Sequence, residues 1–556
     1  MRPWFRYILA IVCGAFLVLF LLVPLGWAVQ SGFFDRGAPT LYWFRQVFTD
    51  LNTAPALMNG VKVACVVTLG AFLVAVPLAM LGHHYDFPGK RLASGLLLVP
   101  MVLPPFVGAV AMQKFMALHG GSFNLILERL HLPEVDWRGG GFNVVVILEI
   151  LHLYPIMYLN AAAAVANVDP TMIEASRNLG ASRWRTFWRV ILPLMAPGLF
   201  AGGTIVFIWS FTELGTPLMV GYERMLPVLI FQGLNKLENP AQTFSMVFVM
   251  LSSAVFMYGL GRVLFGRGAG AMMQRGVAAV AARPGRWAVA GIWLAFGTVT
   301  FLALLPHVGV MLQAFADEWG TTILPTRYTF GHMTKVFSES DTWNSIVNSL
   351  RYASLATVVD IVLGLCIAFL AVRMKVPGGS ALDAMAMLPL AVPGLVIAGG
   401  YVLMTRPGSP LAAIGPDADP MGILVIAYSV RRLPYMVRSI SAGLKQTSVT
   451  LEEAARNLGA GPLRAALRIT IPLIAANVVV GAILTFSFSM LEVSDSLVLA
   501  QKSPHFPITK QIYSLYQGGL EGQAAALGTL GMLLLATTLI LSNLLLGKRL
   551  GTLFRA

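Results

Sequence analysis

Residues 171–193 read TMIEASRNLGASRWRTFWRVILP, and residues 450–472 read TLEEAARNLGAGPLRAALRITIP. The Glu, Ala, Arg, Asn, Leu, Gly and Pro that the two stretches share all recur at one constant offset, since 453 − 174 and 472 − 193 both equal 279. A constant offset over this length indicates two copies of one unit. Both stretches are polar within an apolar chain, so we expect each to lie on the water side of a membrane.

The remainder of the chain is too apolar for a water-soluble globular protein. Hydrophobic residues make up 57% and charged residues 12%, and the mean hydropathy is +0.75. Runs of about 20 apolar residues, the length a helix needs to cross a bilayer, recur throughout. The sequence therefore predicts an all-α polytopic membrane protein with about 12 transmembrane helices, six in each copy. The predicted spans are residues 7–29, 59–81, 93–113, 142–165, 194–220, 241–265, 287–313, 346–372, 381–404, 422–437, 473–500 and 523–546.

The two copies define the expected domains. Residues 1–265 form the first transmembrane unit, residues 266–286 a basic cytoplasmic linker, and residues 287–556 the second transmembrane unit. With both termini in the cytoplasm, most of the 39 Lys and Arg residues fall in cytoplasmic segments, as the positive-inside rule requires. This topology explains the net charge of +14 better than nucleic-acid binding does, so we expect no nucleic acid as a partner.

The repeated segment has the pattern of a short capped helix followed by a turn. A Thr stands three residues before a Glu in each copy, which is a capping-box pattern. Gly180 and Gly459 end the helices, because glycine accepts the positive φ that reverses the chain. We interpret each segment as a docking element, the alternative being a basic loop that serves only topology. The candidate N-cap residues are Asp169 and Thr171 in the first copy and Ser448 and Thr450 in the second.

This spacing resembles the EAA loop of permease subunits in binding-protein-dependent ABC importers, with Ser176 in place of the usual second Ala. The resemblance implies the type I importer fold in a bacterial inner membrane. It also implies that two ABC ATPase subunits, expected as a homodimer, bind the repeated segments, and that a periplasmic or extracellular binding protein delivers the cargo. The implied coupling residues are Glu174, Ala175, Ser176, Gly180 and Pro193, and Glu453, Ala454, Ala455, Gly459 and Pro472.

The chain lacks the motifs of an enzyme. No Gly-x-x-x-x-Gly-Lys-Ser/Thr loop occurs, and no nucleophile elbow or His-Glu-x-x-His pair is present. We therefore expect ATP and Mg²⁺ on the partner ATPases, and no cofactor on this chain. Its three cysteines all lie in apolar spans and indicate neither a disulfide framework nor a metal cluster.

Acidic residues inside apolar spans are the candidates for the translocation pathway or its gate, since charges in a bilayer are costly without a function or a partner. Glu213 and Glu492 are separated by the same offset as the repeated segments. They could line a route for a cation, but either could instead cap a broken helix or hold an arginine. Thr212 and Asp495 stand next to them in the candidate set.

Other polar and helix-breaking residues suggest how the spans pack. Glu149 and His152 share one helix face and are expected to pair with each other or with a neighbouring span rather than bind a metal. Prolines and glycines are dense in the third and ninth spans and permit bends there, for a cavity or for packing. These residues are Pro100, Pro104, Pro105, Pro389, Pro393 and Gly394.

The alternative function is a secondary transporter driven by an ion gradient. That hypothesis does not explain why both halves keep a capped polar segment of the same length. Among these ABC importers, a fused twelve-span permease resembles the ferric-iron, thiamine, polyamine and phosphorylated-organic-anion branch. Within that branch the fused architecture and the paired acids favour ferric iron as cargo, with thiamine, a polyamine or a phosphorylated organic solute as the other candidates.

Overall fold

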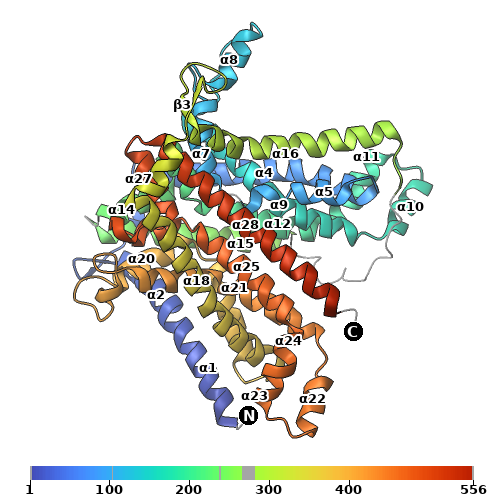
Figure 1. The fold of residues 1–556 in the computed structure, drawn as a ribbon, viewed down its shortest axis with the longest axis vertical. Helices are drawn as coiled ribbons and strands as arrows, with labels where there is room; N and C mark the ends of the chain where they lie inside the picture. The colour runs from blue at the N-terminus through green and yellow to red at the C-terminus, as the bar shows by residue number, and fades with distance from the viewer. Residues whose placement is uncertain (1–2, 103, 237–238, 266–281, 554–556) are drawn as a thin grey trace. The chain divides into compact units, whose positions relative to one another are not determined.

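The computed structural model describes residues 3–102, 104–236, 239–265 and 282–553, and most of its regular structure is helical (Figure 1). The predicted all-α membrane architecture is confirmed. Most of the predicted linker, residues 266–281, lies outside the described residues. The strands form two small antiparallel pairs, β1 (Phe34–Asp35) with β2 (Ala38–Pro39) and β3 (Ala316–Glu318) with β4 (Arg327–Tyr328).

The chain divides into two compact units. Unit 1 contains residues 1–45, 230–248 and 330–556, and unit 2 contains residues 46–229 and 249–329. Each unit therefore contains the first helix of the other sequence repeat. The helices α3 (Tyr42–Thr49), α14 (Leu226–Lys236) and α15 (Pro240–Phe265) cross the unit boundaries.

Unit 1 combines the start of the chain with most of the second repeat. Its helix α1 packs on α18 and α19, and its helix α2 packs on α20. The elements are α1 (Pro3–Leu17), η1 (Val18–Leu22), α2 (Val23–Gly32), α17 (Gly331–Ser338), α18 (Ser340–Ala368), η4 (Phe369–Arg373), α19 (Gly379–Met387), η5 (Leu388–Leu390), α20 (Gly394–Met404), η6 (Ala412–Ile414), α21 (Met421–Gln446), α22 (Thr450–Asn457), α23 (Pro462–Ala465), η7 (Ala466–Thr470), α24 (Ile471–Leu473), α25 (Ala475–Met490), α26 (Ser494–Leu499), η8 (Ser503–His505), α27 (Ile508–Gln517) and α28 (Glu521–Leu553).

Unit 2 combines most of the first repeat with the helix that begins the second. That helix, α16, packs on α7, α5, α4 and α9. The elements are α4 (Thr53–His84), α5 (Lys90–Leu96), α6 (Val99–Val102), α7 (Pro105–Phe115), α8 (Ser122–Arg129), η2 (Gly139–Gly141), α9 (Phe142–Ala166), α10 (Pro170–Asn178), α11 (Arg183–Thr186), η3 (Phe187–Ile191), α12 (Leu192–Thr212), α13 (Gly215–Val220) and α16 (Arg286–Ala314).

The apolar helices match most of the predicted spans. Within the described residues, seven helices are long and apolar enough to cross a membrane, or up to ten if each of three bent pairs is one span. The other two predicted spans, residues 422–437 and 523–546, lie in α21 and α28. The fifth span is displaced from the predicted 194–220, because its helix runs from Arg183 to Thr212 and breaks at Glu213. The eleventh is displaced likewise from the predicted 473–500, because its bent pair runs from Pro462 to Met490.

Both spans that are rich in proline bend, as the sequence predicts. The pair Lys90–Met101 and Pro105–Phe115 meets at 89°, and the pair Gly379–Leu390 and Gly394–Met404 meets at 103°. Pro104 and Pro393 stand at the starts of the second helices in extended conformation, with ψ of 130° and 139°. A proline disfavours helical geometry in the residue before it and has no N–H to donate, so the chain turns at these points.

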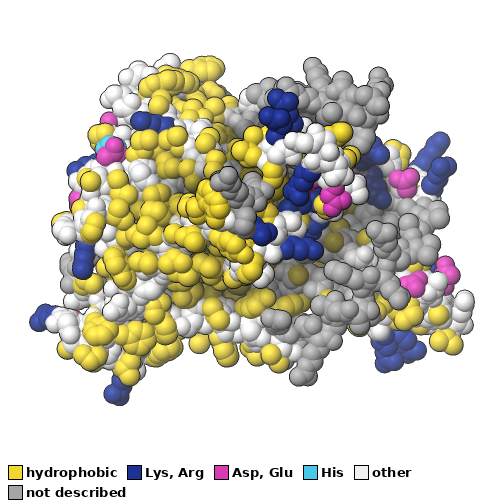
Figure 2. Space-filling view, turned by 90° about the horizontal axis from the view of Figure 1, so that it is seen from below, with side chains coloured by type: hydrophobic (Ala, Val, Ile, Leu, Met, Phe, Trp, Pro, Cys, Tyr) yellow, Lys and Arg dark blue, Asp and Glu magenta, His cyan; other side chains and the backbone are white. Residues whose placement is uncertain are grey.

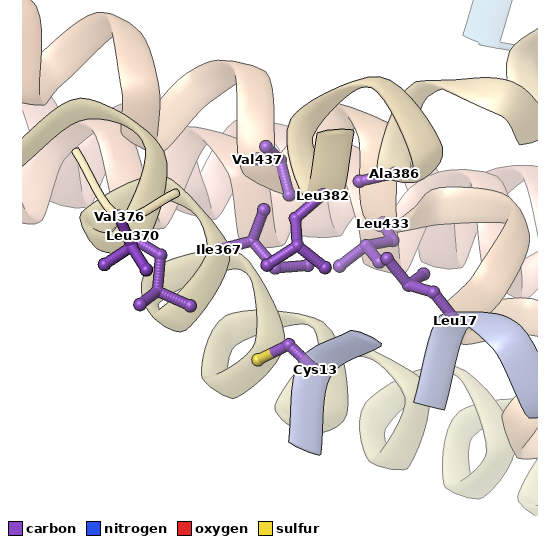
Figure 3. Close-up of a cluster of buried hydrophobic side chains, with 9 residues drawn as sticks. All are labelled: Cys13, Leu17, Ile367, Leu370, Val376, Leu382, Ala386, Leu433 and Val437. Atoms are coloured by element: carbon purple, nitrogen blue, oxygen red, sulfur yellow. The ribbon is translucent and has the colours of Figure 1, made fainter. Parts of the chain in front are cut away.

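Apolar packing joins α1 to the second repeat inside unit 1. Cys13 and Leu17 of α1 lie against Ile367, Leu382 and Leu433, all of them buried (Figure 3). Many other large apolar side chains are exposed, and hydrophobic side chains cover much of the face drawn in Figure 2, with Lys and Arg in small groups. An exposed apolar surface of this extent is typical of a protein whose solvent is lipid.

Candidate functional site

The two repeated segments fold in the same way. In unit 2, α10 is followed by α11, by the π-helical turn η3 and by α12; in unit 1, α22 is followed by α23, by the π-helical turn η7 and by α24. The bounds of α11 and η3 recur at the repeat offset as those of α23 and η7. The predicted short helix and turn are therefore present in both copies. Pro193 and Pro472 lie in the first turn of the helices that follow.

The two short helices begin differently, and neither has the capping-box threonine as its N-cap residue. In the first copy the Asp169 carboxylate accepts hydrogen bonds from the Thr171 N–H at 2.9 Å and the Thr171 hydroxyl at 2.8 Å. These bonds hold the pKa of Asp169 below its usual range. In the second copy the N-cap residue is Val449, which has no capping side chain, so neither Ser448 nor Thr450 is the N-cap; the Ser448 hydroxyl accepts a hydrogen bond from the Thr450 N–H at 3.2 Å.

Each short helix ends as predicted at a glycine with positive φ. Gly180 has φ of 78° and Gly459 has φ of 85°. The residue before each glycine is a leucine, and Leu179 and Leu458 are both 89% exposed. An apolar side chain held in solvent at the same place in both copies is the kind of surface that a partner covers.

The remaining predicted coupling residues occupy matching positions. Glu174 and Glu453 are exposed, as are Ala175 and Ala454, whereas Ser176 and Ala455 are half-buried. The Ser176 hydroxyl lies 3.1 Å from the Thr186 hydroxyl, a contact that Ala455 cannot make. The exposed acids leave each segment with a carboxylate available to a partner.

The segments differ in how they are attached to their own units. In the second copy the Arg373 Nε lies 3.1 Å from the Glu452 carboxylate, which also accepts a hydrogen bond from the Thr470 hydroxyl at 2.9 Å. The residues that match Glu452 and Thr470 in the first copy are Ile173 and Ile191. A buried polar network therefore takes the place of apolar side chains in the second copy.

The candidate pathway acids of unit 1 belong to a buried charged cluster. Glu492 forms ion pairs with Arg432 and, at 3.4 Å, with Arg431. Arg431 Nε also lies 4.0 Å from Asp495, whose two carboxylate oxygens are buried without a hydrogen-bond partner among the described residues. A side chain on Gly394 would collide with the Arg431 guanidinium, so this group lies at the bend of the ninth span.

Two further contacts extend this cluster. The Tyr428 hydroxyl lies 2.6 Å from the Ser496 hydroxyl, and the Ser429 hydroxyl donates to Asp360 at 2.5 Å. The signal that could have identified the cluster was in the sequence. Two adjacent arginines within an otherwise apolar span require acidic partners in the membrane.

The first repeat has His152 and Leu153 at the positions that match Arg431 and Arg432, so its acid is held differently. The Glu213 carboxylate accepts hydrogen bonds from the N–H groups of Gly215 and Thr216, at 3.1 and 3.3 Å, and so caps α13. The neighbouring Thr212 hydroxyl donates to a carbonyl of its own helix, that of Ile208. Of the alternatives left open, Glu213 therefore caps a broken helix, and Glu492 holds arginines.

Glu149 and His152 each contact a neighbouring element of unit 2. The Ser210 hydroxyl donates to Glu149, and His152 Nδ1 lies 2.9 Å from the carbonyl of Pro100. Within the described residues no three His, Cys, Asp or Glu side chains are grouped closely enough to hold a metal ion.

Two segments that connect the helices of unit 2, residues 114–141 and 315–329, contact each other. Lys114 donates to the carbonyl of Gly320 at 2.6 Å, and Ser122 donates to that of Ile323 at 2.9 Å. Figure 1 shows α8 and β3 projecting together beyond the long helices of this unit.

Comparisons with known proteins agree with this geometry. The sequence profile of the family described as "Binding-protein-dependent transport system inner membrane component" matches residues 71–267 and 360–552, once in each repeat.

Several curated relatives are similar over most of this chain. A putative ferric transport system permease protein, FbpB 1 of Haemophilus influenzae, is 26% identical over 84% of this chain and 76% of its own length. The ferric transport system permease protein FbpB of Actinobacillus pleuropneumoniae is 25% identical over 87% and 69%. A probable ABC transporter permease protein, y4fN of Sinorhizobium fredii, is 26% identical over 87% and 86%.

One solved structure, of a bacterial ABC transporter that imports alginate, is 16% identical. It covers 48% of this chain and 96% of that chain, with a TM-score of 0.40.

Proposed function

Since the chain belongs to the family of binding-protein-dependent transport system inner membrane components, and is thus the permease of an ABC importer, we propose that its cargo is ferric iron. Support comes from the ferric transport permeases, which are similar over more than four fifths of this chain. Thiamine, a polyamine and a phosphorylated organic solute are the competing cargoes.

The main support for the proposed transport mechanism is that Leu179 and Leu458, at the tips of the two repeated segments, are equally exposed to solvent. In this proposal one ABC ATPase subunit, with its ATP and Mg²⁺, seats each tip in a groove. Glu174 and Glu453 stand beside the tips and contact the ATPase surface. Closure of the ATPase pair then moves both units, and both chain termini lie with the segments in the cytoplasm.

The binding protein takes the opposite side of the membrane. Its docking surface includes the paired outer loops of unit 2, where Leu118, Ile126 and Leu130 are exposed. The hydrogen bonds of Lys114 and Ser122 hold the two loops to each other, so they offer one continuous surface. Iron released there enters between the transmembrane helices.

The charged cluster and the capping acid are the proposed contacts of the cargo route. Carboxylate oxygens suit hard cations. In unit 1 the ion pairs of Glu492 with Arg431 and Arg432 compensate the acid while no cation is present. In unit 2 Glu213 offers a carboxylate that accepts from two backbone N–H groups. The alternative of an ion-driven carrier is not favoured, because it gives the two docking segments no role.

The test is uptake of radioactive iron into vesicles that contain the chain, the ATPase and the binding protein encoded beside it. We expect uptake only with ATP on the ATPase side and iron-loaded binding protein on the other side. Uptake of labelled thiamine or polyamine in place of iron would reassign the cargo. Uptake driven by a proton gradient without the ATPase would overturn the ABC mechanism itself.

A further inference from the structure

A cavity of roughly 610 Å³ lies in unit 1 beside the second repeated segment. Arg6 and Leu9 of α1, Arg373 at the end of η4, and Glu452 and Arg456 of α22 line it. The first span begins at Arg6 and the eighth ends at Arg373. The cavity therefore lies where apolar spans end, at the level of a lipid headgroup.

The charge in this cavity is positive. Arg373 is paired with Glu452 at 3.1 Å and also donates to the carbonyl of Thr447 at 2.8 Å. That leaves the guanidinium groups of Arg6 and Arg456. The Arg6 Nε is buried and has no hydrogen-bond partner among the described residues, and Arg456 is exposed. The cavity is therefore suited to an anionic ligand, because its one carboxylate is already paired with Arg373 while two other arginines line the wall. Guanidinium groups bind phosphate particularly well.

The rest of the lining is mostly apolar. Val449, Leu463 and Leu467 are 47%, 56% and 55% exposed, so apolar surface stays uncovered around the basic groups. Farther along α1, Cys13 and Leu17 are already buried in the hydrophobic cluster of Figure 3. An inorganic anion would leave the apolar surface in water, whereas a ligand with an acyl chain would cover it.

We propose that this cavity binds an anionic phospholipid, with its phosphate between Arg6 and Arg456 and an acyl chain along the exposed leucines. The inference rests on the proposed function, which places α22 at the cytoplasmic face. The cytoplasmic leaflet is rich in anionic lipid, which attracts basic groups near the surface. The lipid would connect α1 to α22, and so the lipid composition would affect the coupling of the ATPase to transport.

The first repeat supplies an internal control. A cavity of roughly 700 Å³ beside α10 in unit 2 is lined by Arg177 and Arg183, but also by Asp169 and Glu174. Its charges are balanced within the wall, so we expect no tight binding of a phosphate group there. Arg177 is the residue of the first repeat that matches Arg456, and it provides the matched substitution.

The experiment uses the full chain, without ATPase or iron, in nanodiscs of phosphatidylcholine with one quarter phosphatidylglycerol. Native mass spectrometry measures how much phosphatidylglycerol stays bound after transfer to detergent. We expect the wild-type chain to retain it and the Arg6→Gln/Arg456→Gln double variant to bind it about thirtyfold more weakly. Arg177→Gln should retain it like the wild type.

Three outcomes would overturn the inference. They are equal retention by the double variant, equal loss in Arg177→Gln, and displacement of the lipid by millimolar inorganic phosphate, which would indicate a site for a free anion. Failure of the proposed function is recognised separately. A chain that binds phosphatidylglycerol but imports no iron refutes the cargo, whereas one that imports iron normally without retaining the lipid refutes only this inference.

Discussion

The Arg373 guanidinium lies 3.1 Å from the Glu452 carboxylate, and the two side chains are only 9% and 10% exposed. This pair joins the end of the eighth span to α22, whereas α10 in the first repeat has Ile173 at the position that matches Glu452. The two repeated segments have the same backbone fold, but an ion pair holds the second where the first has an apolar side chain. They should therefore respond differently to mutation.

Replacement of Glu452 by Gln should destabilise unit 1. The change leaves the Arg373 guanidinium buried without its counter-charge, which costs about 3–5 kcal/mol in comparable buried pairs. We expect a lower unfolding temperature for the purified chain and weaker coupling of ATP hydrolysis to uptake. Glu453→Gln is the matched control, because that neighbouring side chain is exposed and its loss should leave the unfolding temperature unchanged. If both variants unfold alike, the buried pair does not anchor the helix.

Substitution of the glycine that follows α10 or α22 should be unfavourable because of the backbone conformation alone. At Gly459 no atom lies near the space a Cβ would fill, yet φ is 85°. A side chain in this backbone conformation costs roughly 1–2 kcal/mol. We expect Gly459→Ala to weaken ATPase binding about tenfold in a pull-down titration, and Gly180→Ala to do the same. Gly461→Ala should bind normally, because Gly461 has φ of −64° and the same open space.

The sequence was sufficient for the features that repeat and insufficient for those that differ between the repeats. The constant offset predicted both short helices and the glycines that follow them, and the clustered prolines predicted the bends of the third and ninth spans. The repeat could not predict that Glu452 would face Arg373, since the residue that matches Glu452 is an isoleucine and no periodic pattern marks the pair.

Arg431 and Arg432 illustrate a different limit. When the predicted span 422–437 is considered by itself, the two arginines only make it less typical of a transmembrane helix. Their partners Glu492 and Asp495 lie far along the chain, on another element that tertiary packing brings close. A physical rule that buried charges need partners names the kind of residue required, but not which of several acids supplies it.

The two candidate pathway acids should respond differently to amide substitution. Glu492→Gln leaves Arg431 and Arg432 without their shared carboxylate, so we expect loss of uptake together with a lower unfolding temperature. Glu213→Gln keeps an oxygen that can cap α13, so it should fold normally while uptake falls several-fold if the charge contacts iron. Assembly with the ATPase should persist in both. Normal uptake by both variants would remove these acids from the pathway.

The Asp169 cap predicts how docking of the first segment depends on pH. Its carboxylate has a lowered pKa, so the ionised cap is fully formed above about 3.9, the unfolded value, and is lost as the pH falls through the folded value. ATPase binding should therefore not change through this group between neutral pH and about pH 5. Asp169→Asn keeps an acceptor and should bind normally, whereas Asp169→Ala should bind more weakly at every pH in that range. A pH-dependent defect in wild type that Asp169→Asn abolishes would contradict this account.

The exposed leucines at the segment tips should carry much of the ATPase affinity. Burial of one leucine side chain contributes about 1.5–3 kcal/mol, so Leu179→Ser or Leu458→Ser should each weaken ATPase binding by about tenfold to a hundredfold. The substitutions remove no buried contact, because both side chains are 89% exposed, and the chain should keep its unfolding temperature. Leu132→Ser, in an outer loop at 51% exposure, is the control that should leave ATPase binding unchanged. Titration of the labelled ATPase against nanodiscs of each variant measures the affinities. Unchanged affinity in the Leu179→Ser/Leu458→Ser double variant would show that the tips do not enter the ATPase.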